Sequence, residues 1–370
     1  MAESFEIRPF EECIEKIKYT TKIASQDFKE SGRFPIISQE EAFISGYWDN
    51  PEDVFHINKP VVIFGDHSRH IKYVDFDFVI GADGVKILSP VKSINAKYFY
   101  YFLKWLDIPS LGYSRHYKAL KEKSVKVFSE TCQQRIVDEL DLLTGIIDKK
   151  NAQLRDLDAL AQSIFYEMFG DPAVNEKGWP VKQISDLFDV GSSKRVFESE
   201  WRDSGVPFYR AREIVRLSKG LPLEDPIFIE ESLFAAYKEK YGIPAAGDIM
   251  VTGVGTLGIC YLVKEGDRFY FKDGNTLWFK DKHISNSRFI KDQFLTEFVK
   301  DQIKGNSHGA TVGTYTIVNA KKTRVICPPV KLQNEYEERV NAIDSQKRVI
   351  GKSLTETQNL LDSRMHNYFG

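Results

Sequence analysis

The sequence predicts an α+β fold in which two mixed α/β domains are each followed by a long helix. Two observations predict this fold class. A long heptad pattern of apolar residues occurs twice, and similar strand and helix signals precede each copy in the same order. The expected order is domain (1–126), helix (127–170), domain (171–325) and helix (326–370). Because each apolar stripe needs a partner, we expect the helices to pair as an antiparallel coiled coil with pseudo-two-fold symmetry.

The two long helices are predicted from apolar residues that recur at steps of three and four. The first stripe is broken only at Lys150 and contains Ile136, Leu140, Leu143, Ile147, Leu154, Leu157, Ala161, Ile164 and Met168. The second is broken at Lys347 and Thr357 and contains Tyr336, Val340, Ile343, Ile350, Leu354 and Leu361. The two stripes are separated by about two hundred residues. At that separation Gln133 matches Gln333, and Phe169-Gly170 matches Phe369-Gly370. We therefore expect Lys150 and Lys347 to mark the helix register or a docking surface.

Each predicted domain mixes short strands with helices. In the first, strand patterns at 34–38, 60–64, 73–80 and 85–88 precede an aromatic-rich helical pattern at 95–106. The second repeats this order at 204–209, 248–251, 276–279 and 287–299 with low identity. Phe169-Gly170-Asp171-Pro172 predicts the end of the first long helix, and Cys327-Pro328-Pro329 predicts the start of the second.

The composition describes a soluble globular protein of 370 residues, of which 42% are hydrophobic and 28% are charged. No apolar run is long enough to span a membrane, and the acidic start lacks the apolar core of a secretory signal, so a cytoplasmic chain is expected. The four cysteines are scattered, which supports neither disulfides nor a zinc site. A net charge of −2 argues mildly against nucleic acid unless the charge is segregated or a partner supplies backbone contacts.

A glycine motif, Gly253-Val254-Gly255-Thr256-Leu257-Gly258, has the spacing of a dinucleotide or S-adenosylmethionine loop. Such a loop needs a helix after it, whereas strand–turn–strand signals follow here, so a close backbone approach to DNA or to another strand is favoured. The sequence also lacks the D/N-P-P-Y/F tetrapeptide of amino-methyltransferases and a Walker A lysine loop. Catalytic residues and a bound cofactor are therefore not expected in this chain.

The domain–helix–domain–helix order resembles the specificity (S) subunits of type I restriction-modification systems. The resemblance also covers 63–69 through 78–84, 247–255 through 271–275, and the helix opening at Cys327-Pro328-Pro329. It implies that the two domains are target-recognition domains, each reading half of a split, asymmetric DNA site, while the helices act as a ruler. It further implies docking of two methyltransferase subunits, which would hold S-adenosylmethionine, and association with restriction subunits. The first helix departs from the family pattern because no prolines open it.

The candidate DNA-contacting residues lie in loops. Matching loops ahead of the two long helices supply Arg115, His116 and Lys118 in the first domain and Asn306, Ser307, His308 and Thr311 in the second. A loop between strands supplies His67, Ser68 and Arg69, where arginine can bind guanine bidentately. Further basic candidates are Lys22, Arg33, Lys194, Arg195, Arg210 and Arg212. The alternative interpretation of each loop is a solvated charged face.

Three functions remain open on the residues alone. The first is a non-catalytic DNA-recognition subunit that binds double-stranded DNA and methyltransferase partners. The second is a stand-alone S-adenosylmethionine-dependent DNA methyltransferase that uses the glycine loop near Gly255, and the third is an interaction scaffold that ignores DNA sequence.

Overall fold

A computed structural model describes residues 4–109, 112, 114–305 and 313–370. The chain forms two compact units, which we call unit 1 (1–154 with 349–370) and unit 2 (155–348). Both long helices cross from one unit to the other, so each unit contains one globular part and half of each long helix. The predicted limits of the recognition domains stay a prediction.

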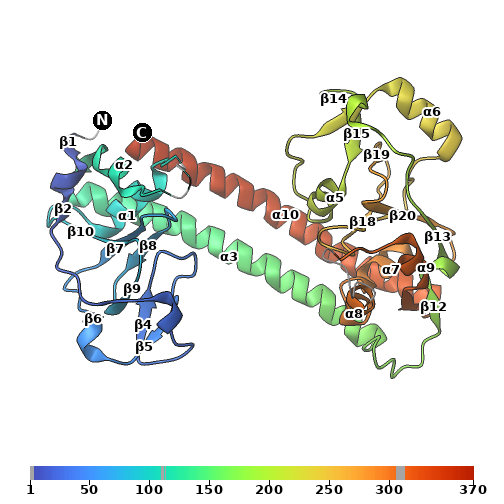
Figure 1. Ribbon diagram of the computed structural model, residues 1–370, viewed down its shortest axis with the longest axis horizontal. Coiled ribbons are helices and arrows are strands. Elements are labelled where there is room, and N and C mark those ends of the chain that lie inside the picture. Colours follow the sequence, from blue (N-terminus) through green and yellow to red (C-terminus); the bar gives the residue numbers. More distant parts are fainter. Residues whose placement is uncertain (1–3, 110–111, 113, 306–312) are drawn as a thin grey trace. The chain divides into compact units, whose positions relative to one another are not determined.

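The globular part of unit 1 contains short strands and short helical segments before the first long helix (Figure 1). Its strands are β1 (Phe5–Pro9), β2 (Ile14–Glu15), β3 (Lys22–Ile23), β4 (Phe34–Ile37), β5 (Gly46–Trp48), β6 (Val54–Phe55), β7 (Val61–Gly65), β8 (Ile71–Val74), β9 (Phe78–Gly81), β10 (Val85–Pro90) and β11 (Ser124–Phe128). Its helical segments are η1 (Phe10–Cys13), η2 (Ser25–Asp27), η3 (Pro51–Asp53), α1 (Ala96–Trp105) and α2 (Tyr117–Lys121).

Three sheets organise unit 1. The strand orders are β1-β11, β2-β10-β7-β8 and β3-β9-β4-β5, with β6 also paired to β9. β7 is buried along its whole length, as its run of β-branched and aromatic residues predicts. Helix α1 packs against this strand and its neighbours, and Tyr98, Phe99 and Phe102 on α1 are buried in the core. The aromatic stripe of α1 is therefore core.

The globular part of unit 2 repeats this arrangement. Its strands are β12 (Val181–Gln183), β13 (Phe188–Gly191), β14 (Trp201–Arg202), β15 (Val206–Tyr209), β16 (Ile227–Ile229), β17 (Ile249–Thr252), β18 (Cys260–Leu262), β19 (Tyr270–Phe271), β20 (Thr276–Asp281) and β21 (Arg324–Ile326). Its helices are α4 (Ile184–Leu187), η4 (Glu198–Glu200), α5 (Ala211–Ser218), α6 (Glu231–Tyr241), α7 (Ser287–Gln293), α8 (Glu297–Gly305) and α9 (Ile317–Lys322).

The sheet topology confirms the predicted internal duplication. β12-β21 corresponds to β1-β11, and β13-β20-β17-β18 corresponds strand for strand to β2-β10-β7-β8. The third sheet of unit 2, β14-β16-β15-β19, keeps the parallel pair β15–β19 that matches β4–β9 in unit 1. Unit 2 differs mainly between β15 and β17, where α5, β16 and α6 replace the shorter β5–β6 segment.

The two long helices, α3 (Glu130–Phe169) and α10 (Val330–Phe369), are 40 residues each. In unit 1 the N-terminal half of α3 lies beside the C-terminal half of α10, and in unit 2 the other two halves are paired (Figure 1). This confirms the antiparallel pairing predicted from the heptad stripes. Phe369 packs on Tyr98 in unit 1 with ring centroids 5.3 Å apart, and Phe169 packs on Phe289 in unit 2 at 4.6 Å.

The polar breaks in the two stripes face partners on the opposite helix. In unit 1, Lys150 Nζ donates to the hydroxyl oxygens of Ser353 and Thr357, both at 2.7 Å, and to the backbone oxygen of Ser353 at 2.9 Å. Thr357 is itself one of the predicted exceptions, so two breaks meet in one layer. In unit 2, Lys347 forms an ion pair with Asp158. Both lysines therefore hold specific cross-helix contacts.

Two negative findings apply to the described residues alone. No helix among them combines the length and apolar character that a membrane span requires. No group of three or more His, Cys, Asp or Glu side chains within 4–109, 112, 114–305 and 313–370 is placed to hold a metal ion.

Candidate nucleic-acid interface

In unit 1 the β7–β8 turn and the segment that leads into α2 are tied together at Asp66. The Asp66 side chain is 2% exposed, and its Oδ1 accepts a hydrogen bond from the backbone nitrogen of Tyr117, the first residue of α2, at 2.8 Å. A carboxylate at a helix N-terminus is favourable because the first backbone N–H groups of a helix lack partners. Lys86 Nζ lies 3.7 Å from the other carboxylate oxygen. Two predicted DNA-contact loops, distant in the sequence, therefore become neighbours.

His116 reinforces this tie and is not exposed. It is 1% exposed, its backbone nitrogen donates to the backbone oxygen of Asp66 at 2.8 Å, and its Nδ1 lies 2.9 Å from the same oxygen. In this arrangement its ring does not reach solvent, so the prediction that His116 contacts DNA does not fit the described structure. A structural role follows, because the ring fills the junction between turn and helix.

Arg115 and Lys118 flank His116 and are exposed. Neither side chain forms a hydrogen bond or ion pair with the part of the chain that the structure describes. Their backbone is fixed from both sides, because His116 is anchored to Asp66 and Tyr117 begins α2. Exposed cationic side chains on an anchored backbone are what binding to phosphates or base edges requires.

The three candidates of the β7–β8 turn contribute mostly to the turn itself. Gln39 fixes the backbone of His67, since the Gln39 Oε1 accepts from the His67 N–H at 3.1 Å, and the Ser68 hydroxyl donates to the Gln39 backbone oxygen. Arg69 adopts φ 65°, and its guanidinium donates to the backbone oxygen of Ile108 at 2.7 Å. Arg69 is exposed but already holds a carbonyl partner, so it ties a third loop to this surface.

Lys22 and Arg33 lie apart from the Asp66 junction, around the β3-β9-β4-β5 sheet. Both are exposed, and both cations lie over aromatic rings: Lys22 over Tyr19 and Arg33 over Phe34, each 5.0 Å from the ring centroid. Their charged ends remain accessible while the rings limit their freedom. They stay candidates for backbone contacts.

Unit 2 builds the same junction from different residues. Gly253 takes the place of Asp66: its backbone nitrogen donates to Asn275 at 2.9 Å, as Asp66 does to Gly84 at 2.7 Å. Its backbone oxygen accepts from the nitrogen of Tyr315 at 2.9 Å, as Asp66 accepts from His116. Tyr315 is 1% exposed, like His116.

The glycine motif thus serves a close approach of backbones. A Cβ on Gly253 would lie 3.0 Å from the backbone oxygen of Tyr315. β17 and β18 on either side pair as an antiparallel hairpin. The motif is followed by β18, a turn and β19, so the strand–turn–strand prediction is confirmed and no helix N-terminus follows the motif. The motif therefore lacks the geometry of a dinucleotide-binding loop.

The remaining candidates of unit 2 have mixed placements. Asn306, Ser307, His308 and Thr311 lie outside the described residues. Lys194 and Arg195 are exposed; the backbone nitrogen of Lys194 donates to the Tyr270 hydroxyl at 3.0 Å, and Arg195 Nε pairs with Asp273 at 3.0 Å. They lie next to the turn that leads into β20.

Arg210 and Arg212 converge on one buried carboxylate. Glu213 is 1% exposed and accepts hydrogen bonds from both guanidinium groups at 2.7 Å. Burial alone would raise the pKa of Glu213, but hydrogen bonds from Arg210 and Arg212 hold that pKa below its ordinary value. Both arginines are therefore committed to positioning α5, and the sequence did not indicate this because it shows no reason for Glu213 to be buried.

The structure also shows residues that sequence reasoning missed. Asp66, Gln39 and Lys86 organise the unit 1 junction, and each of them contacts a partner that is distant in the sequence. The available signal was the acidic residue directly after β7 (Val61–Gly65), and one carboxylate beside a strand does not identify its partner.

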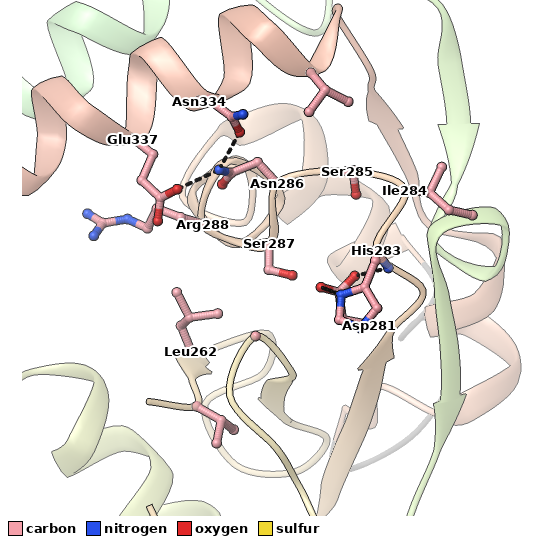
Figure 2. Close-up of a pocket in the computed structure, with 13 residues that line it drawn as sticks. Leu262, Asp281, His283, Ile284, Ser285, Asn286, Ser287, Arg288, Asn334 and Glu337 are labelled. Atoms are coloured by element: carbon pink, nitrogen blue, oxygen red, sulfur yellow. Dashed lines mark hydrogen bonds and ion pairs between the residues drawn. The ribbon is translucent and has the colours of Figure 1, made fainter. Parts of the chain in front are cut away.

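Unit 2 also has an open cavity of about 440 Å³ between the β17–β18 hairpin and the start of α10 (Figure 2). Asp281, Ser287, Leu262 and Glu337 are among its lining residues. Figure 2 shows Asn286 bridging from the cavity wall to Asn334 and Glu337 on α10. The cavity lies at the connection between the globular part and the long helix.

Comparisons with known proteins agree with this architecture. Residues 176–356 match the family described as the type I restriction modification DNA specificity domain. A putative type I restriction enzyme specificity subunit from Haemophilus influenzae is 23% identical over 367 residues, covering 95% of this chain and 89% of that protein. The chain is therefore similar to type I restriction specificity subunits along almost its whole length.

Solved structures of this family share the fold. The S subunit from M. genitalium matches with a TM-score of 0.61 at 14% identity, covering 100% of this chain and 97% of that chain. A chain from a structure that describes complex assembly and conformational transition of the type I R-M system matches with a TM-score of 0.52 at 11% identity, covering 99% and 97%. The predicted α+β fold class is thereby confirmed, and the relatives are named for specificity, which is a non-catalytic role.

Proposed function

We propose that this chain is the sequence-specific DNA-recognition subunit of a type I restriction-modification complex, reading a bipartite and asymmetric site through its two globular parts. The main supporting observation is the duplicated junction in a chain that is similar to type I restriction specificity subunits. The same loop pair is held in both units by the same backbone hydrogen bonds. The side chains differ, since Asp66 and His116 stand where unit 2 has Gly253 and Tyr315, so the two half-sites should differ.

Base recognition in this proposal comes from exposed residues around each junction. Arg115 and Lys118 are the leading contacts in unit 1. Lys194 is the leading candidate in unit 2, together with Asn306 and His308, which lie outside the described residues. The net charge of −2 supports a division of labour, because a chain without excess positive charge favours a partner that supplies much of the phosphate neutralisation.

The chemistry belongs to the partners in this proposal. Two methyltransferase subunits would dock on the chain and would bind S-adenosylmethionine, and restriction subunits would associate through them. The helix pair would set the spacing between the half-sites. Support comes from the family match over 176–356 and from a glycine motif whose geometry does not suit a dinucleotide.

The test is to co-express the full chain with its methyltransferase subunit and to sequence the methylated positions in host DNA. We expect one split motif with two different halves. Binding of a duplex with that motif is then measured with and without the methyltransferase subunit. Absence of any sequence-dependent binding in both cases would reject the proposal.

Calorimetry separates the alternatives. The isolated chain is titrated with S-adenosylmethionine, for which the proposal predicts no heat of binding. Saturable binding would instead support a stand-alone methyltransferase. Tight binding of the partner that ignores DNA sequence would support a scaffold.

A further inference from the structure

In unit 1 a buried glutamine joins the globular part to the long helix. Gln133, on the first turn of α3, is fully buried, and its Oε1 accepts a hydrogen bond from the backbone nitrogen of Asn95 at 2.8 Å. Its Nε2 donates to the backbone oxygens of Ser93 and Phe128 at 3.0 and 2.8 Å. Asn95 in turn caps α1, since its Oδ1 accepts from the backbone nitrogen of Lys97 at 2.8 Å. One side chain therefore fixes the start of α1 against the start of α3.

Two exposed contacts strengthen this joint. The Asn95 side chain donates to Gln134 Oε1 on α3 at 3.1 Å. Near the start of α1, Lys97 pairs with Asp141 on α3 at 2.8 Å, with about a third of each side chain exposed. Exposed ion pairs contribute little to stability, so the buried glutamine is the main directional contact.

Unit 2 repeats the main contacts of this joint. Gln333 is fully buried, its Oε1 accepts from the backbone nitrogen of Asn286 at 2.8 Å, and its Nε2 donates to the backbone oxygen of Pro328 at 2.6 Å. Asn286 caps α7 and reaches Asn334 at 3.0 Å and Glu337 at 2.6 Å, as Figure 2 shows. Arg288, two residues on, takes the place of Lys97 and pairs with Asp344 at 2.6 Å.

Core packing alone does not account for this repetition. A buried amide costs free energy unless every polar atom is hydrogen-bonded, whereas an apolar residue of similar volume would fill the same space without that requirement. Most globular residues differ between the units, yet both copies keep a glutamine, a capping asparagine and a basic residue in one geometry. Hydrogen bonds are directional and apolar contacts are not, so this geometry restricts rotation of the globular part on the helix.

We propose that Gln133 and Gln333 are positioning residues that fix the orientation of each recognition domain on its helix and thereby restrict the number of base pairs tolerated between the two half-sites. This inference rests on the proposed function. Adding one base pair to B-DNA moves a half-site by about 3.4 Å and rotates it by about 35°. A domain that cannot turn on its helix must reject such a site.

The experiment uses the full chain co-expressed with its methyltransferase subunit. Methylation is measured on a plasmid library that carries the wild-type motif with n−1, n and n+1 base pairs between the half-sites. Gln133→Met keeps the side-chain volume and removes the hydrogen bonds, and Gln333→Met does the same in unit 2. Gln153→Met, on an exposed face of α3, is the matched control.

Each glutamine variant is expected to raise methylation at n−1 and n+1 relative to n by about fivefold, the effect of losing about one net hydrogen bond. The bases preferred in both half-sites should not change, and Gln153→Met should match the wild type. A folded variant that keeps the wild-type spacing ratio overturns the inference. So does a variant that loses base preference instead, because that indicates damage within the domain.

Two milder substitutions test the inference if the buried substitutions prevent folding. Asn334→Ala removes the exposed tie from the asparagine cap of α7, and Gln134→Ala removes the corresponding tie in unit 1 together with an exposed hydrogen bond to Asp138. Each should raise methylation at n−1 and n+1 relative to n by about twofold. Unchanged ratios overturn the inference. A wild-type complex that methylates no split motif would instead reject the proposed function, which distinguishes the two failures.

Discussion

Arg115 combines an exposed guanidinium with an anchored backbone, which makes it the sharpest single-residue test of the interface. Arg115→Ala should weaken specific binding of the complex to its motif by about 1–3 kcal/mol if the side chain reads a base. If it contacts only phosphate, binding should weaken equally on all sequences and the salt dependence should fall. Titrations of specific and non-specific duplexes at several salt concentrations measure both. Lys92→Ala, exposed on the same unit, should leave specific binding unchanged.

The buried ion pairs of unit 2 predict a dependence of stability on pH. Burial alone would raise the pKa of Asp292, but the charges of Lys291 and Arg288 hold that pKa below its ordinary value. Because the folded-state pKa is the lower one, the stabilisation is present above the unfolded pKa of about 3.9 and is lost as the pH falls through the folded value.

Arg288→Met removes one of these charges and should destabilise unit 2 by about 3–5 kcal/mol at neutral pH. The difference from the wild type should shrink as the pH falls below about 4, because the wild type then loses the stabilisation that ionised Asp292 provides. Urea unfolding between about pH 3 and 7 measures both effects. Lys300→Met, which removes an exposed pair with Glu297, should cost little at any pH. A difference that grows in acid would contradict this assignment.

Single-residue roles were only partly predictable. The exposed basic residues of the first domain could be found from their residue types, because charge tends to stay at surfaces. The burial of His116 and Glu213 could not, since it depends on Asp66 and on two arginines brought close by the fold. Partners that are distant in the sequence leave no local signal.

At the scale of elements, the polar layer around Lys150 predicts a cost in stability for the paired helices. Lys150→Leu restores the heptad and should raise the free energy of unfolding of unit 1 by about 1 kcal/mol, because a polar residue in a coiled-coil seam costs stability. Calorimetry of the full chain measures the change. Lys149→Leu, on the exposed neighbouring position, should give no gain. A loss in Lys150→Leu would show that its three hydrogen bonds outweigh the burial of an apolar side chain.

Elements were more predictable than residues. The stripe 136–168 and its second copy indicated both long helices, because an apolar period of 3.5 residues sustained over several heptads is typical of paired helices. The joints were harder to find: the helices repeat at a shift of two hundred residues, but Asn95 and Asn286 differ by 191. Because the globular parts differ in length, a comparison of the two halves at one fixed offset does not align these asparagines.

At the scale of the whole molecule, the duplicated units predict a modular function. Replacing residues 173–325 by the corresponding domain of a relative should change one half-site of the methylated motif and leave the other unchanged. Methylation-site sequencing of DNA from cells that express the exchanged complex measures this. A change in both half-sites would contradict the assignment of one half-site to each unit. Re-insertion of the original segment should restore the original motif.

The division of the chain into units has a consequence for its synthesis. Unit 1 contains residues 1–154 but also needs 349–370, so a ribosome must add 155–348 in between before the unit can be completed. At about 5–20 residues per second this takes roughly 10–40 s, far longer than a helix needs to form. During that interval the apolar stripe around Ile136 and Leu143 on the nascent chain lacks its C-terminal cover. We therefore expect ribosome-bound chains to engage holding chaperones and to be cleaved readily by proteases until 349–370 have been synthesised.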